Sequence, residues 1–121
     1  MFEKKPQQQT TDSFVEQIAS WKQQHGDVIE IQAEESGDPE LDDLTIFCKK
    51  PGRTELSRFI KDAASGDALK AQNNFFFGCL LYPAPDVVKA IVDKKPGLIV
   101  ALGNELQSLT GINQSFFMKK L

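Results

Sequence analysis

Few residues of this 121-residue sequence have types and spacing that could do chemistry. Its single histidine, His25, stands directly before Gly26. A catalytic base needs a nucleophile and an orienting carboxylate within reach, and no motif here supplies either. A histidine in the last turn of a helix interacts favourably with the helix dipole, and we favour that structural role. We therefore predict no catalytic residue and no enzymatic activity.

One stretch concentrates carboxylates, which are the ligands that hard cations prefer. Its acidic residues are Glu34, Glu35, Asp38, Glu40, Asp42 and Asp43. A calcium-binding loop needs glycine at its sixth position and glutamate at its twelfth. Counted from Asp38, those positions hold Asp43 and Lys49. We therefore predict a solvated loop with no metal and no cofactor, and keep a small metal-dependent enzyme using this loop as an alternative.

A short basic string surrounds a predicted turn at Pro51-Gly52, with Lys49, Lys50 and Arg53. Phosphate-binding loops require the pattern GxxxxGK[ST], which KKPGRT does not match. The formal net charge is −3, so the chain as a whole has no general attraction to nucleic-acid backbones. We predict a polar surface turn here and keep nucleic-acid binding as a minor alternative.

The distribution of apolar residues argues against a membrane or secreted protein. The longest apolar run, Leu98–Leu102, has five residues, whereas a membrane span needs about 20. The first residues lack the apolar core of a signal peptide. The two cysteines, Cys48 and Cys79, lie in apolar surroundings, which favours buried thiols over a disulfide. We expect a soluble protein in the cytoplasm.

The elements that position these residues change period along the chain. After a flexible lead-in at 1–10, a helix is expected from Ser13 to Gly26, followed by alternating strands near 27–33 and 44–48. These two strands predict an antiparallel hairpin over 27–49 whose connection is the acidic loop. The N-terminal part is therefore one helix and a two-stranded hairpin.

The remainder, 54–120, shows helical spacing throughout. The stretch from Asp67 to Pro83 is apolar on several sides, so we expect it to be the central helix. The flanking helices are expected near 54–65, 85–95, 96–110 and 113–120. The predicted fold class is α+β, in which the N-terminal helix and hairpin are followed by a bundle of four to five helices. Residues 1–121 are expected to form a single domain.

The apolar cluster near residue 120 is the best candidate for binding a partner. It consists of Phe116, Phe117, Met118 and Leu121. Such groups either dock on the core or are left for a partner, and exposed apolar patches on small proteins mark interaction sites. Phe47 is a secondary candidate, because the strand alternation places it on the outer face of the hairpin.

The order of motifs resembles the small tail assembly chaperone-like proteins of tailed bacteriophages and prophages. WKQQHGDVIEI leads to FCKKPGRTELSRFI, then to CLLYP, DVVKAIVDKKPGLIVALGNELQSLTG and KKL. The resemblance covers about 14–121. The positions that fit best are Trp21, Gly26, Pro51, Arg58, Phe59, Cys79, Tyr82, Pro83, Pro96, Gly97 and Gly111.

This resemblance implies a non-enzymatic binding role. Such proteins are thought to coat the long, helical tape measure protein while tail tube subunits polymerise around it. The partners implied are the tape measure protein and the tail tube protein, and a homo-oligomer stays open. The alternative is a structural component of the phage particle, either a tail or a head-completion protein.

Overall fold

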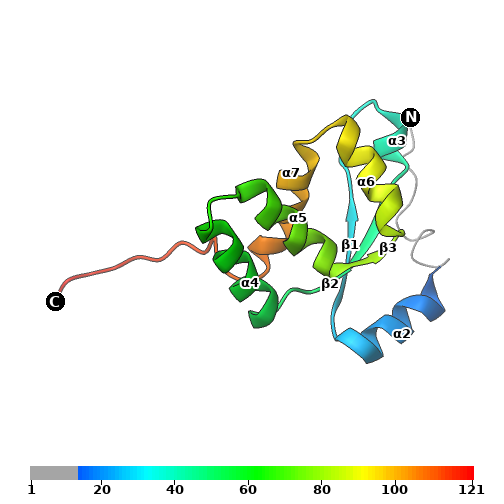
Figure 1. Ribbon diagram of the computed structural model, residues 1–121. Coiled ribbons are helices and arrows are strands. Elements are labelled where there is room, and N and C mark those ends of the chain that lie inside the picture. The colour runs from blue at the N-terminus through cyan, green and yellow to red at the C-terminus, as the bar shows by residue number, and fades with distance from the viewer. Residues whose placement is uncertain (1–13) are drawn as a thin grey trace. The chain divides into compact units, whose positions relative to one another are not determined.

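Three short strands and six helices form within residues 14–121, the part of the chain that the computed structural model describes (Figure 1). The chain divides into two compact units. The first comprises Met1–Lys50 and Leu80–Ala84, and the second Pro51–Cys79 and Pro85–Leu121. The predicted lead-in at 1–10 and the predicted helix cap Ser13 lie outside the described residues. The expectation of a single domain stays a prediction.

The first unit is a small antiparallel sheet with two helices. Its elements are α2 (Val15–His25), β1 (Val28–Gln32), α3 (Pro39–Asp42), β2 (Thr45–Lys49) and β3 (Leu80–Tyr82). The strand order is β1-β2-β3, and β1 pairs with β2 in a register that runs from Val28↔Lys49 to Gln32↔Thr45. The predicted antiparallel hairpin is therefore confirmed. A third strand, which the sequence analysis missed, adds to it.

Local chemistry explains where α2 stops and β1 begins. Gly26 has a φ of +86°, a left-handed conformation that glycine adopts without a steric cost, and its N–H donates to the carbonyl of Lys22. The alternation of Ile29 and Ile31 with polar residues then suits an extended strand. α2 presents Trp21 to the sheet, where its ring lies 5.6 Å from that of Phe47.

The second unit is a group of four helices. They are α4 (Arg53–Ala64), α5 (Ala68–Cys79), α6 (Pro85–Lys94) and α7 (Leu98–Ser108). α5 contacts both α4 and α7, so the prediction that this helix is central is confirmed for this unit. Phe59 of α4 meets Phe75 of α5 edge to face, with ring centroids 5.5 Å apart. The buried apolar residues of the unit are Ala71, Phe75, Phe76, Cys79, Val88, Ile91, Ile99 and Leu106.

The architecture is α+β, as the sequence predicted, with three differences in its elements, of which the first is the short helix α3 within the predicted acidic loop. The central helix ends at Cys79, and the next three residues form β3 because they pair with β2. The predicted helix over 113–120 is wrong, since the chain has no regular structure after a turn at 111–113. Among residues 14–121, no helix combines the length and apolar character that crossing a bilayer requires.

Candidate functional site

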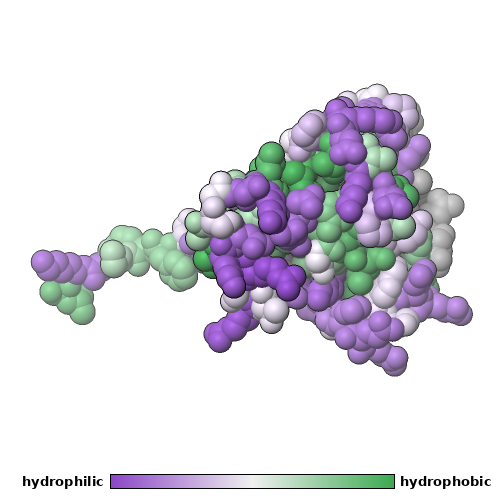
Figure 2. Space-filling model, in the orientation of Figure 1, coloured by the Kyte–Doolittle hydropathy of each residue, from purple (hydrophilic) through white to green (hydrophobic). Residues whose placement is uncertain are grey.

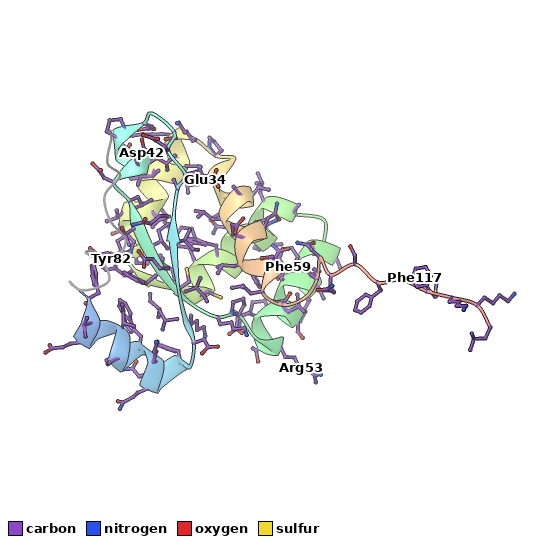
Figure 3. The ribbon with its side chains drawn as sticks, turned by 180° about the vertical axis from the view of Figure 1, so that it is seen from behind. Glu34, Asp42, Arg53, Phe59, Tyr82 and Phe117 are labelled. Carbon is purple, nitrogen blue, oxygen red and sulfur yellow. The ribbon has the colours of Figure 1, made fainter. Side chains whose placement is uncertain are left out.

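The strongest candidate site is the apolar segment 113–121, which follows the turn after α7. Its large apolar side chains are almost completely exposed: Phe116 88%, Phe117 89%, Met118 91% and Leu121 106%. In Figure 1 this part of the chain runs away from α4 and α7, and Figure 3 places Phe117 on it. The structure therefore leaves all four predicted residues together in one segment that no described part of the chain covers.

The end of α7 shows how the apolar segment is separated from the helices. The N–H of Leu109 donates to the carbonyl of Leu106, which closes the last turn of the helix. Gly111 then adopts a φ of +87°, and the N–H of Gln114 bonds its carbonyl at 3.0 Å. This left-handed glycine redirects the chain, so the apolar segment is not a continuation of α7.

The chemistry available to the apolar segment is that of a binding element. Hydrophobic colour follows most of the extended chain in Figure 2, and hydrophilic colour appears towards its end. Lys119 and Lys120 are the segment's cationic groups, and no carboxylate, histidine or cysteine occurs in it. Exposed apolar groups flanked by charge mark sites of protein interaction on small proteins. The apolar segment can therefore cover apolar surface on a partner and contact acidic groups at its margin.

Two further exposed apolar residues lie close to this segment, and the sequence did not identify them as candidates for binding. Leu109 is 39% exposed and Ile112 is 45% exposed. Leu109 lies inside the helix that the sequence predicts near 96–110, but α7 ends one residue before it, so the helical spacing no longer applies. Gly111 could have indicated their exposure, because glycine commonly marks the end of a helix and the start of an irregular segment.

The placement of Phe47 on an exposed outer face is wrong. Its side chain is only 1% exposed, and the neighbouring Ile46 and Cys48 are also buried. Consecutive strand residues point to opposite faces, so both faces of β2 are covered. Phe14, Trp21 and the ring of Tyr82 surround Phe47, with centroid distances of 5.1, 5.6 and 6.2 Å. Phe47 is thus a core residue of the first unit and not a binding residue.

The acidic stretch is more ordered than a solvated loop. The short helix α3 forms within it, and the carboxylate of Asp38 caps this helix by accepting the N–H of Glu40 at 3.1 Å. Asp42 accepts the N–H and the hydroxyl of Ser36, both at 2.9 Å, and the N–H of Gly37 at 3.1 Å. Figure 3 shows Asp42 and Glu34 near the same end of the first unit.

These hydrogen bonds have an electrostatic consequence for Asp42. The backbone N–H of Ser36, followed by its hydroxyl, lowers the pKa of the Asp42 carboxyl below its ordinary value. The Asp42 carboxylate therefore stabilises the acidic stretch itself, through its hydrogen bonds to Ser36 and Gly37. Within residues 14–121 there is no group of three or more side chains suited to hold a metal ion.

The remaining sequence candidates serve local structure. His25 is the last residue of α2, as expected. Gly52 donates its N–H to the carboxylate of Glu55 at 2.7 Å, a contact that anchors the start of α4 next to Arg53. Arg53 itself is exposed at the first position of that helix.

The fold and the exposed segment together define a small α+β protein with a helical second unit. The chain belongs to the family described as Domain of unknown function (DUF6848), whose profile matches residues 21–119. A solved structure of an uncharacterised protein from Bacillus stearothermophilus is similar, with a TM-score of 0.66 and 22% identity. The match covers 84% of this chain and 98% of that one. At this identity the likeness shows the fold alone. The search of curated proteins gives no significant match.

Proposed function

We propose that this protein is a non-catalytic binding protein of the tail assembly chaperone type. In this role it holds a long apolar helical partner, the tape measure protein, in soluble form in the cytoplasm of the host cell during phage tail assembly. The observation that supports the proposal is the apolar segment, in which four large apolar side chains are 88–106% exposed. The motif order that resembles such chaperones supplies the identity of the partner.

The energetics of the apolar segment suit a binding role. Each large apolar side chain that passes from water to a buried position contributes about 1.5–3 kcal/mol. All four large apolar side chains of the apolar segment can be buried against a partner, because none is covered by the described chain. A tape measure helix presents apolar residues at helical spacing. The apolar segment can cover these residues and so keep the tape measure protein from aggregating. The net charge of −3 on the chaperone favours solubility of the complex.

Co-expression tests this proposal directly. The protein, carrying an affinity tag, is produced together with the longest coiled-coil-like open reading frame near its gene. We expect the long protein to be soluble only in the presence of this chain and to co-elute with it. If the long protein is insoluble in both conditions, or soluble alone without binding, the chaperone function is refuted.

A pair of substitutions assigns the binding to the apolar segment. Phe117→Asp places a charge in the exposed cluster and is expected to abolish co-elution. Val15→Asp is the matched control, because Val15 is an exposed apolar residue of α2 (54%) in the first unit. Equal loss of binding in both variants would contradict a specific role of the segment. Mass spectrometry of purified phage particles then separates a chaperone, which is absent from them, from a structural component, which is present.

A further inference from the structure

The apolar segment has no regular structure in the free chain. The N–H of Gln114 bonds the carbonyl of Gly111, but residues 115–121 make no backbone–backbone hydrogen bond within the described chain. Their side chains gain no burial either, as the exposures of Phe116, Phe117 and Met118 show. Apart from the Ser115 carbonyl, which accepts the Nε2–H of Gln114 at 3.2 Å, no hydrogen bond within the described chain holds the backbone of this stretch, so it is free to form a new element.

The order of residues in the apolar segment is that of an amphipathic helix. At about 100° per residue, Phe117, Met118 and Leu121 fall within an arc of about 100°, which is the width of a helical apolar stripe. Phe116 and Lys119 fall on the opposite side. In a strand, by contrast, Phe117 and Met118 would point to opposite faces. Only the helical arrangement gathers three of the four apolar groups on one face.

The start of the segment carries a residue that favours a helix terminus. Asn113 is a type of residue that caps the N-terminus of a helix through its side-chain oxygen. A short isolated helix is nevertheless unstable in water, because nucleation is costly and short helices recover too few hydrogen bonds. A covering surface is needed, and the described chain provides none.

We propose that the apolar segment 113–121 folds into a helix only when it binds its partner. Phe117, Met118 and Leu121 then form the contact face, and Phe116 stays outside it. The partner surface is a protein helix with an apolar stripe bordered by carboxylates, since Lys120 stands beside Phe117 at the edge of the stripe and favours acidic neighbours. This inference rests on the proposed function, for which it specifies the binding geometry.

A serine scan distinguishes the helical from the extended form. The variants F116S, F117S, M118S and L121S are compared for binding to the long helical protein of the co-expression experiment. We expect at least a tenfold weaker affinity for F117S, M118S and L121S and a change of less than threefold for F116S. Because all four side chains are exposed in the free chain, all four variants should keep the wild-type unfolding midpoint. An F116S loss as large as that of F117S, or no loss for M118S, would overturn the helical geometry.

A second pair of variants tests the backbone conformation while keeping every apolar group. Proline inside a helix removes an N–H and clashes with the preceding turn, so K119P should weaken binding about 100-fold. K119A removes the same charge but is a good helix former, so it should change binding less than threefold. Hydrogen exchange of the wild-type complex should show slowed amides in the segment. Equal binding by K119P and K119A would overturn the inference and leave the proposed function intact.

Two other results are decisive. If the wild-type chain does not bind the long helical protein at all, the proposed function fails before the geometry is tested. If vesicles containing phosphatidylglycerol slow the amide exchange of the segment while the long helical protein does not, the occupant is a lipid surface and the inference is overturned.

Discussion

The contact between α5 and α7 depends on the absence of a side chain at Gly103. This glycine is buried, and a Cβ atom built on it would overlap Oε1 of Gln72 and lie 3.0 Å from Cδ of that side chain. The Gln72 amide donates to Asn104 Oδ1 at 3.1 Å and accepts the Nε2–H of Gln107 at 2.7 Å. Gln107 is 6% exposed, so this hydrogen bond satisfies a buried donor. Gly103→Ala would therefore displace Gln72 and disrupt both bonds.

The expected cost of Gly103→Ala follows from two opposing contributions. The added methyl group would meet only the end groups of the Gln72 and Gln107 side chains, so Gln72 moves aside and its hydrogen bonds are lost. Leaving the Gln107 amide without its acceptor costs about 1–3 kcal/mol. Replacing glycine by alanine inside a helix recovers about 1 kcal/mol. The net expectation is a destabilisation of about 0–2 kcal/mol, with a fall in the unfolding midpoint of about 4 °C for each kcal/mol.

Thermal and urea unfolding followed by circular dichroism measure this effect. Gly78→Ala is the matched control, because it makes the same substitution within α5 where an added Cβ meets nothing within 4 Å. It should leave the protein unchanged or stabilise it by up to about 1 kcal/mol. In a Gln72→Ala background the overlap is gone, so Gly103→Ala should become neutral or stabilising. A destabilisation of the same size with and without Gln72 would refute this explanation.

Three further predictions address the aromatic core, the acidic stretch and the apolar segment. Phe47→Ala should destabilise the protein by about 3–5 kcal/mol, because it removes a buried ring. It should also shift the fluorescence emission of Trp21, whose ring lies next to Phe47, to longer wavelength. An unchanged emission maximum and an unchanged unfolding midpoint would contradict a core position. The hydrogen bonds from Ser36 lower the pKa of Asp42 in the folded state. The stabilisation that these bonds provide is therefore complete above the unfolded-state pKa of 3.8 and is lost as the pH falls through the lower folded-state pKa. Asp42→Asn should accordingly be less stable than the wild type at pH 7, with the difference shrinking below about pH 4; a difference that is constant with pH would refute this linkage. Phe117→Asp should leave the unfolding midpoint nearly unchanged, since its ring is exposed, and a large drop would instead show that the ring is packed.

The sequence predicted the elements whose patterns are local. Helical spacing predicted α4 near 54–65, and the alternation over 27–33 and 44–48 predicted β1 and β2 with their antiparallel pairing. Periods of 3.6 and 2 residues arise within a single element, so they can be recognised without knowing what packs against it. The apolar cluster around Phe117 was recognised from composition alone, and the structure shows that it is exposed.

The errors involve contacts between segments that are distant along the chain. Leu80 appeared to continue the central helix, because a short apolar run is compatible with either structure, and its pairing with β2 decides for a strand. Phe47 seemed to point to water, since alternation does not reveal that α2 returns over that face. The helix at 113–120 was expected from residue types that favour a helix only once one side is covered.

The connectivity of β3 has a consequence for how the protein is made. Leu80–Tyr82 completes the sheet of the first unit, but this strand stands in the sequence between α5 and α6 of the second unit. During synthesis the hairpin of β1 and β2 emerges early, with one edge of β2 open, and it stays open until the whole of α5 has followed. A cut at Lys50 would therefore yield one fragment with an incomplete sheet and another carrying its missing strand. The gene cannot be divided at that point into two self-sufficient halves, although the first fifty residues look like a module of their own.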